Sequence, residues 1–380
     1  MNLITPYALR GLANCWMPDK HRWSTIYHLD GRENPNESIP AGDVFYTLNV
    51  LLGLAKAGVT DYDLRSIYQH NVSLLGAYPM PPYAYGMALW AGAELGETIP
   101  ESVRAFIRNQ KQWAHFTAQD IGMILSGICA QKDKGCTDFD AESPLFYKRI
   151  KQYFLTASGL FRNSAVGIRQ DFASFAAQTY LITACYHYGK IFDVAEASDI
   201  ADNATMTMLM KQGANGEWPW FYHAPSGVVV DQYEFYSVHQ HGMAALFLFP
   251  AAERNILGAK RSIIQGFNWL LGNNDLQHPM LLPELGMIYR SIARSSELDS
   301  KIKRGLRSVY HCVIQSSNRH DLPENLTIRK ECRSYELGWL LHAFGHRSDL
   351  PEITENSAFA LHVNQTHRPF LLQSDTSICG

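Results

Sequence analysis

Apolar residues recur along the chain at three- and four-residue spacing, in stretches separated by short polar breaks that contain Gly, Pro or Asn. This spacing places apolar side chains on one face of a helix. Residues 43–58 are typical, because they begin with Asp43, which suits the positive end of the helix dipole, and end at Gly58. The pattern predicts about twelve or thirteen helices joined by short connections. They are expected at 43–58, 61–75, 82–96, 101–113, 117–131, 144–158, 170–189, 193–212, 237–250, 258–271, 285–296, 300–316 and 331–345.

One long segment, residues 213–236, interrupts this alternation. It is rich in Gly and Pro and keeps no helical period. Within it we expect a short β-hairpin at 217–232 that turns at residues 225–227. Paired helices with an inserted hairpin predict an all-α fold, an (α/α)6-type toroid of about twelve helices in a single domain over residues 1–380. A helical solenoid or an irregular bundle is the alternative, although a solenoid should show a repeated motif and none is visible.

Residues 211–220 (KQGANGEWPW) contain a Gly-Trp turn between two predicted helices. This turn resembles the Q-x-x-x-G-x-W turn of terpenoid cyclases, which Gln212, Gly216 and Trp218 match position by position. Polysaccharide lyases and six-hairpin glycosidases have comparable turns. Residues 269–276 (WLLGNNDL) are similar to the L-G-x-N-P-L turn of some cellulase-like toroid hydrolases, with Asp in place of the proline. The resemblance is to the α/α-toroid superfamily and implies an enzyme with a central pocket.

Several motifs of that superfamily are missing. Residues 138–141 (DFDA) lack the last acid of the D-x-D-D motif of protonating terpene cyclases, and the D-D-x-x-D motif of metal-dependent prenyl-diphosphate enzymes is absent. There is also no Cys/Cys/His zinc set of the lanthionine-type toroid cyclases. P-loop, G-x-G-x-x-G, G-x-S-x-G and H-E-x-x-H patterns do not occur. We therefore expect neither a metal nor another cofactor.

The composition is that of a globular chain with a large core, since 46% of the 380 residues are hydrophobic and 18% are charged. A net charge of −3 gives no indication of nucleic-acid binding, and 12% aromatic residues suit a pocket for sugars or hydrocarbons. No signal peptide and no transmembrane run is apparent. The seven cysteines include no C-x-x-C pair, which favours free thiols in a reducing compartment and a cytoplasmic location.

The first candidate site lies between residues 217 and 243. His, Asp and Glu side chains can move protons, and flat aromatic rings pack against the C–H face of a sugar. His239 at a helix start is a candidate acid or base, although a buried His bonded to a carbonyl is the alternative. Joint metal binding by His239 and His241 is not expected, because residues two apart diverge on a helix. Asp231 and Glu234 are further catalytic candidates, and the candidate substrate-binding residues are Trp218, Trp220, Tyr222, Tyr236 and Gln240, although Trp218 could simply fill the turn.

The second candidate site is at residues 329–339 (RKECRSYELGW). Glu331 and Glu336 are candidate acid–base residues, with Tyr335 beside them and Arg333 as a clamp for a uronate or phosphate group. The alternative is that these charged groups cap a helix and pair with each other.

Three other residues are candidates for substrate binding. Glu284 follows a proline at a predicted helix start, where the helix dipole alone would favour it. Tyr46 and Asn49 are polar residues on one face of an otherwise apolar helix, so they could point into the ring. They could equally form hydrogen bonds between helices.

The sequence thus favours a carbohydrate-active enzyme, a glycoside hydrolase, lyase or sugar epimerase, that uses His and Glu acid–base groups in an aromatic-lined central pocket. Its partner would be a small molecule or an oligosaccharide. One alternative is a non-standard terpenoid cyclase whose aromatic rings stabilise a carbocation. The other alternative is a non-catalytic helical scaffold with an exposed groove.

Overall fold

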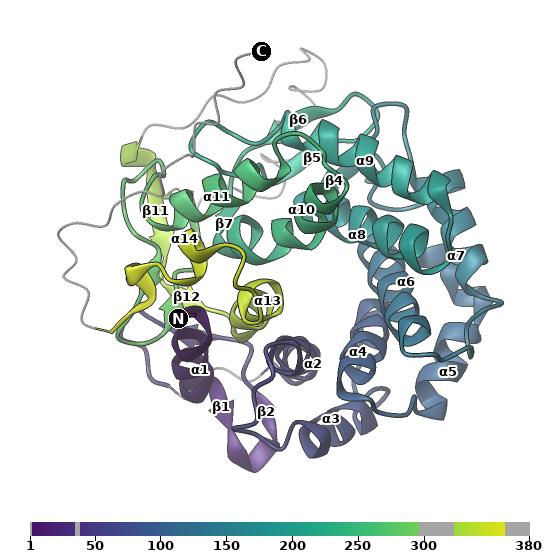
Figure 1. The fold of residues 1–380 in the computed structure, drawn as a ribbon, viewed down its shortest axis with the longest axis horizontal. Helices are drawn as coiled ribbons and strands as arrows, with labels where there is room; N and C mark the ends of the chain where they lie inside the picture. Colours follow the sequence, from purple (N-terminus) through teal and green to yellow (C-terminus); the bar gives the residue numbers. More distant parts are fainter. Residues whose placement is uncertain (1, 35–38, 296–322, 362–380) are drawn as a thin grey trace.

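The computed structural model describes residues 2–34, 39–295 and 323–361, and they form a closed ring of helices (Figure 1). Six helices line the inside of the ring and contact one another in succession. The last contact is completed by a π-helical turn, η4 (His239–Met243), which leads into α10 and packs against α13. The inner helices are α2 (Pro40–Lys56), α4 (Pro82–Leu95), α6 (Ala118–Asp133), α8 (Phe175–Ile191), α10 (Ala244–Glu253) and α13 (Ser334–Phe344).

A second set of helices lies outside the first, and each outer helix packs on one or two inner helices. Inner and outer helices alternate along the chain, so all inner helices run in the same direction. This arrangement confirms the predicted α/α toroid. The outer helices are α1 (Ile4–Cys15), α3 (Leu64–Ser73), α5 (Glu101–Arg108), α7 (Ser143–Arg149), α9 (Ala195–Leu209) and α11 (Ala259–Leu270), and a short helix α14 (Pro351–Thr354) follows α13.

The inner helices approach each other closely because glycines lie at their contacts. A Cβ atom on Gly53 of α2 would be 2.2 Å from the carbonyl oxygen of Gly338 in α13. One on Gly127 of α6 would be 2.4 Å from the carbonyl oxygen of Gly86 in α4. Any larger residue at these positions would push the helices apart, since protein interiors are close-packed.

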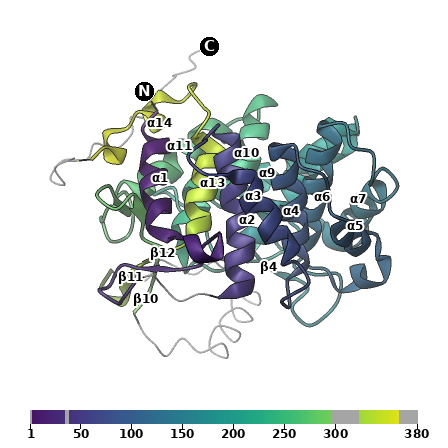
Figure 2. The ribbon, with the colours of Figure 1, turned by 90° about the horizontal axis from the view of Figure 1, so that it is seen from below.

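Short strands gather at one end of the ring, where the outer helices connect to the N-terminal ends of the inner ones (Figure 2). The predicted hairpin is confirmed as β5 (Phe221–His223) and β6 (Val228–Asp231), and β4 (Phe172–Ser174) pairs with β5. The other strands are β1 (Trp16–Met17), β2 (Arg22–Trp23), β3 (Tyr27–His28), β7 (Phe235–Tyr236), β8 (Leu281–Leu282), β9 (Met287–Ile288), β10 (Ser291–Arg294), β11 (Leu326–Arg329) and β12 (Glu331–Cys332).

The helix predicted at 285–296 is wrong. Leu285, Ile288 and Ile292 have helical spacing, but the chain forms β9 and β10 there. Strand β10 pairs with β7 on one side and β11 on the other. Pairing with distant segments overrides the local pattern, as is common for strands. The helix predicted at 300–316 lies outside the described residues.

Other boundaries differ because strands and tight turns take over the ends of predicted helices. The helix expected at 331–345 starts only at Ser334, because residues 331–332 pair with β3. The helix expected at 170–189 starts at Phe175, where the Ser174 side chain accepts a hydrogen bond from the Ala177 amide. The outer helix α1 was not predicted. The helices expected at 101–113 and 144–158 end in a 3-10 helix (Gln110–His115) and a π-helix (Ile150–Phe154).

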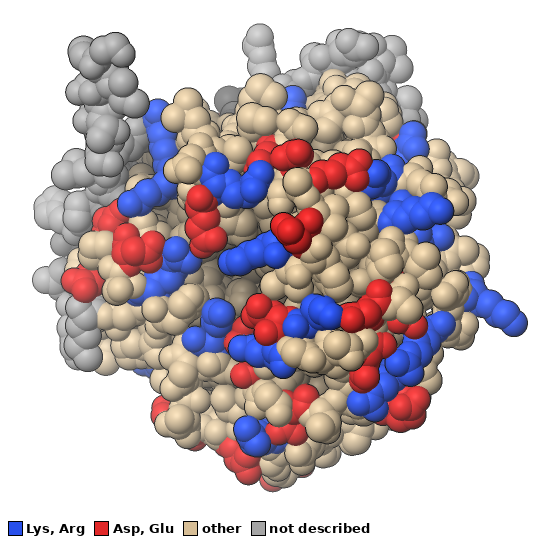
Figure 3. Space-filling model, turned by 45° about the vertical axis from the view of Figure 1, so that its right-hand side comes forward, with Lys and Arg blue, Asp and Glu red and all other residues tan. Residues whose placement is uncertain are grey.

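Within the described ranges, no helix is long and apolar enough to cross a bilayer. On the face drawn in Figure 3, Lys and Arg side chains are interspersed with Asp and Glu.

The close contact between α2 and α13 can be tested by a substitution that adds one methyl group. We expect Gly53→Ala to lower the free energy of unfolding by about 1–3 kcal/mol, because the methyl overlaps the Gly338 carbonyl in an overpacked interface. Urea unfolding followed by circular dichroism measures this change. The control is Ala55→Ser, at a half-buried position of the same helix, which should change stability by less than about 0.5 kcal/mol. Equal stability of both variants would contradict the close contact.

Candidate active site at the N-terminal ends of the inner helices

A buried ion-pair cluster lies where the strands meet the N-terminal end of α13. Arg290, next to β10, places its Nη1 atom 2.9 Å from Oε1 of Glu336 and its Nε atom 3.3 Å from Oε1 of Glu331. Glu331 also accepts hydrogen bonds from Arg333, at 3.0 Å from Nε and 2.8 Å from Nη2. One oxygen of Glu331 is therefore shared by two guanidinium groups. We call Arg290, Glu331, Arg333, Tyr335 and Glu336 the Arg290 cluster.

Glu336 is the most perturbed carboxyl of the Arg290 cluster. It is fully buried in the first turn of α13. Burial raises its pKa to about 8, although the nearby Arg290 guanidinium acts in the opposite direction. Its second oxygen, Oε2, has no hydrogen-bond partner among the described residues. Burial thus favours the protonated form of Glu336, and the Arg290 guanidinium beside it favours the charged form.

Aromatic rings surround the guanidinium of Arg290. Its carbon lies 4.8 Å from the ring centre of Tyr236 and 5.9 Å from that of Tyr335. Tyr46, from α2, lies with its ring 4.5 Å from that of Tyr335. Burial raises the pKa of Tyr46, and the positive charges of Arg290 and Arg333 oppose this rise. The three tyrosines and the cation thus form one connected group of contacts.

His239 begins the π-helical turn η4 and lies against the same aromatic group. Its ring is 5.1 Å from that of Tyr236 and is stacked parallel to Trp220 at 6.0 Å. Burial lowers the pKa of His239 to about 3, with further contributions from Arg290 and His241. Its Nδ1 atom is buried without a hydrogen-bond partner in the described part of the chain. The neutral form of the imidazole is therefore favoured at neutral pH.

Four of the predicted site residues are buried in contacts within the protein. Trp218 is fully buried and packs against Phe175, and its backbone amide donates to Gln240, which also donates to the Tyr236 carbonyl. The Asn49 side chain donates to the Tyr335 carbonyl at 2.9 Å and accepts from the Trp339 indole at 3.3 Å. These hydrogen bonds join α2 to α13. Tyr222 is fully buried in the strand β5.

The remaining acidic candidates form other ion pairs. Asp231 in β6 lies 2.9 Å from Arg294. Glu234 bonds to Arg329 and to the Ser291 hydroxyl, both at 2.9 Å. These pairs tie the hairpin to the sheet of β7, β10 and β11. Glu284 lies in an exposed turn that packs against the outer helix α1.

Sequence reasoning missed Arg290, which the structure places at the centre of the cluster. The residue was assigned to a helix, and its position depends on the pairing of β10 with β7 and β11. A buried arginine needs acidic partners. The two nearby acids, Glu331 and Glu336, were therefore the feature of the sequence that could have indicated a buried arginine. In the parts of the chain that the structure describes, no three His, Cys, Asp or Glu side chains are arranged to hold a metal ion.

A cavity of about 330 Å³ lies inside the ring at the other end, among the C-terminal ends of the inner helices. None of the predicted site residues lines it. Trp339 lies between the two ends, because its ring is 6.4 Å from that of Tyr180 and 5.9 Å from that of Trp90 in the cavity wall.

With its alternating helices and its strands at one end, the chain has the fold of an α/α toroid. No protein-family model matches it, and no curated protein sequence matches it significantly. A cellobiose 2-epimerase from Bacillus thermoamylovorans has the same fold, with a TM-score of 0.61 and 9% identity over 91% of this chain and 99% of the epimerase.

Two further solved structures are similar at the same level. A sugar epimerase from a ruminal bacterium has a TM-score of 0.58 and 9% identity, over 91% of this chain and 96% of its own. An unsaturated glucuronyl hydrolase from a Bacillus species, responsible for the degradation of glycosaminoglycan, has a TM-score of 0.55 and 12% identity, over 90% of this chain and 94% of its own. These likenesses establish the fold.

The raised pKa of Glu336 should be measurable as a pH dependence of stability. Between its unfolded pKa near 4.5 and its folded pKa near 8, the folded protein holds a proton that the unfolded chain releases. Stability therefore falls as pH rises through this window, by at most about 1.4 kcal/mol per pH unit for this group. The Glu336→Gln variant has no carboxyl to titrate at this position. Its free energy of unfolding, relative to that of the original protein, should therefore increase from pH 5 to pH 8. A difference that stays constant in chemical denaturation at both pH values would contradict the assignment.

Proposed function

We propose that the protein is a carbohydrate-active enzyme that transfers protons to and from a sugar at the Arg290 cluster. The main support is that Glu336 and His239 border the same arginine, because Arg290 pairs with Glu336 and also lowers the pKa of His239. The environment makes the carboxyl the protonated group and the imidazole the neutral one. Two groups whose pKa values are moved in opposite directions suit an acid–base pair. The sugar enzymes with the same fold agree with this proposal.

In this proposal Glu336 donates a proton and His239 accepts one. Trp220 and Tyr236 would lie along the apolar face of the sugar ring, since both rings flank His239. Arg290 holds the Glu336 carboxyl in place through the 2.9 Å contact, and Asn49 fixes the first turn of α13 through the Tyr335 carbonyl. The positive ends of the inner helix dipoles point to this end of the ring and favour negative charge that develops on the substrate.

The geometry favours epimerisation or elimination over hydrolysis by two carboxylates. A hydrolase of that kind needs a second carboxylate that is available to activate water or attack the sugar. Glu331 is engaged by Arg333 and Arg290 through one oxygen, so it acts as an ion-pair partner. An isoprenoid substrate agrees less well with this site, because a terpenoid cyclase would surround the carbocation with apolar and aromatic walls, and charged groups are concentrated here.

The proton transfer can be tested with cellobiose in deuterium oxide and with a uronate-containing oligosaccharide. Epimerisation would incorporate deuterium at the sugar carbon, and elimination would form an unsaturated product with ultraviolet absorbance. We expect Glu336→Gln and His239→Ala each to lower kcat by about 10²–10⁴, the usual contribution of an acid or base. Glu101→Gln, at an exposed position of the outer helix α5, is the control and should keep the original rate. Full activity of both site variants on a substrate that the protein turns over would refute the proposal.

Arg333 is proposed to bind an acidic group of the substrate. It lies beside Tyr46 and pairs with Glu331, whereas Arg290 is engaged by both Glu331 and Glu336. Arg333→Lys keeps the charge but loses the two-pronged geometry of guanidinium. We expect it to raise KM for a uronate substrate by about tenfold while leaving KM for cellobiose unchanged. An equal change for both substrates would indicate that Arg333 only stabilises Glu331.

A further inference from the structure

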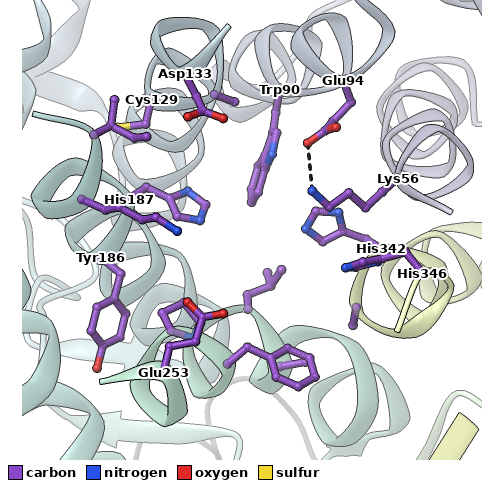
Figure 4. A pocket seen from close by; sticks show the side chains of 18 of the residues that line it. Lys56, Trp90, Glu94, Cys129, Asp133, Tyr186, His187, Glu253, His342 and His346 are labelled. Carbon is purple, nitrogen blue, oxygen red and sulfur yellow. Dashed lines mark hydrogen bonds and ion pairs between the residues drawn. The ribbon is translucent and has the colours of Figure 1, made fainter. Parts of the chain in front are cut away.

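The cavity at the C-terminal ends of the inner helices has the features of a binding site. Its volume of about 330 Å³ is within the range of small-molecule pockets. Trp90 of α4, His187 of α8 and His342 of α13 point inward from three sides (Figure 4). The two imidazoles approach the Trp90 ring edge-on at 5.3 Å each. We call this cavity the C-terminal pocket.

Neutral hydrogen-bonding groups form the inner wall of the C-terminal pocket. Burial lowers the pKa of His187 to about 4 and that of His342 to about 3, and the charge of Lys56 contributes to both shifts. Lys190 contributes to the shift of His187, whereas Asp133 opposes it, and His346 contributes to the shift of His342. A neutral imidazole offers one donor and one acceptor. Nδ1 of His342 is buried and has no partner in the described part of the structure.

The charged groups at the rim of the pocket largely balance each other. Lys56 lies 3.5 Å from Glu94. A dashed line marks this ion pair in Figure 4. Arg347 pairs with Asp349 at 3.0 Å and covers one ring face of Phe249 at 3.7 Å. The other charged residues that line the pocket are two cations, Lys134 and Lys190, and two anions, Asp133 and Glu253.

This balance bears on the kind of ligand. An anion would face the carboxylates and the negative ends of the inner helix dipoles, and a cation would face the lysines. A neutral polyhydroxylated ligand would find acceptors, donors and an apolar wall of Trp90, Leu246 and Phe249 for its C–H groups. Lysines in the last turns of helices are explained by their favourable interaction with the helix dipole. The imidazoles that point into the cavity are not explained in this way.

We propose that the C-terminal pocket is a second carbohydrate site, separate from the Arg290 cluster, that binds a neutral mono- or disaccharide without transforming it. Three features support this proposal: the imidazoles that point into the cavity, the similar numbers of positive and negative groups at its rim, and its apolar wall. It does not depend on the chemistry proposed at the Arg290 cluster, because the two sites share no side chain and Trp339 lies between them.

The test uses the whole protein and a site-resolved readout. The Cε1–H resonances of His187 and His342 are followed by NMR while glucose, cellobiose or inorganic phosphate is added through the millimolar range. The rim variant Lys190→Met/Glu253→Gln changes two exposed side chains of the pocket, so folding should be preserved. Lys148→Met, on the outer helix α7, is the matched control.

We expect glucose or cellobiose to shift both resonances in the original protein, in Lys148→Met and in Glu336→Gln. The rim variant should bind the saccharide about tenfold more weakly, which corresponds to the loss of about 1.4 kcal/mol. Resonances that do not respond to either saccharide, or that respond only to phosphate, would overturn the proposal. An unchanged affinity of the rim variant would also overturn it. Persistence of the shifts in Glu336→Gln separates this site from the catalytic proposal, which has its own activity test.

Discussion

The close contact between inner helices is the constraint on which the rest of the structure depends. Where Gly53 meets Gly338 and Gly86 meets Gly127, two backbones approach so closely that no Cβ atom fits between them. Helices packed at such short range leave little freedom in their relative position. The ring therefore presents the first turns of all its inner helices in a fixed arrangement, and Glu336 on α13 owes its position to the contact between α13 and α2.

A fixed ring can hold charged groups that would be costly in a looser structure. Arg290 and Glu336 are buried together, and such a pair is stable only if both groups remain close and well oriented. Strand pairing positions Arg290, which precedes β10, and the inner helix α13 positions Glu336. The Tyr236 and Tyr335 rings exclude water from the guanidinium between them. The two perturbed groups, an acid that keeps its proton and a histidine that remains neutral, follow from this burial.

Much of this architecture could be predicted from the sequence, because helix-period stretches and Gly-Pro breaks are local signals. The hairpin at 221–231 and most helices were found in this way. Arg290 was not, since its surroundings arise from strand pairing between segments far apart in the chain. Glu336 was predicted from a charged group at a helix start, and Tyr46 from its place as a polar residue on an apolar helix. The second rule selects Asn49 equally, although the Asn49 amide is hydrogen-bonded to Tyr335 and Trp339.

All strands of the described chain occur in connections that enter the ring at the N-terminal ends of the inner helices. The helices of the ring and the strands at its end are thus encoded in different stretches of sequence. Insertions or substitutions in those connections can alter that end of the molecule while the glycine contacts of the ring remain intact. The chain shares the fold of a cellobiose 2-epimerase over 91% of its length at only 9% identity, so the same ring is compatible with very different sequences.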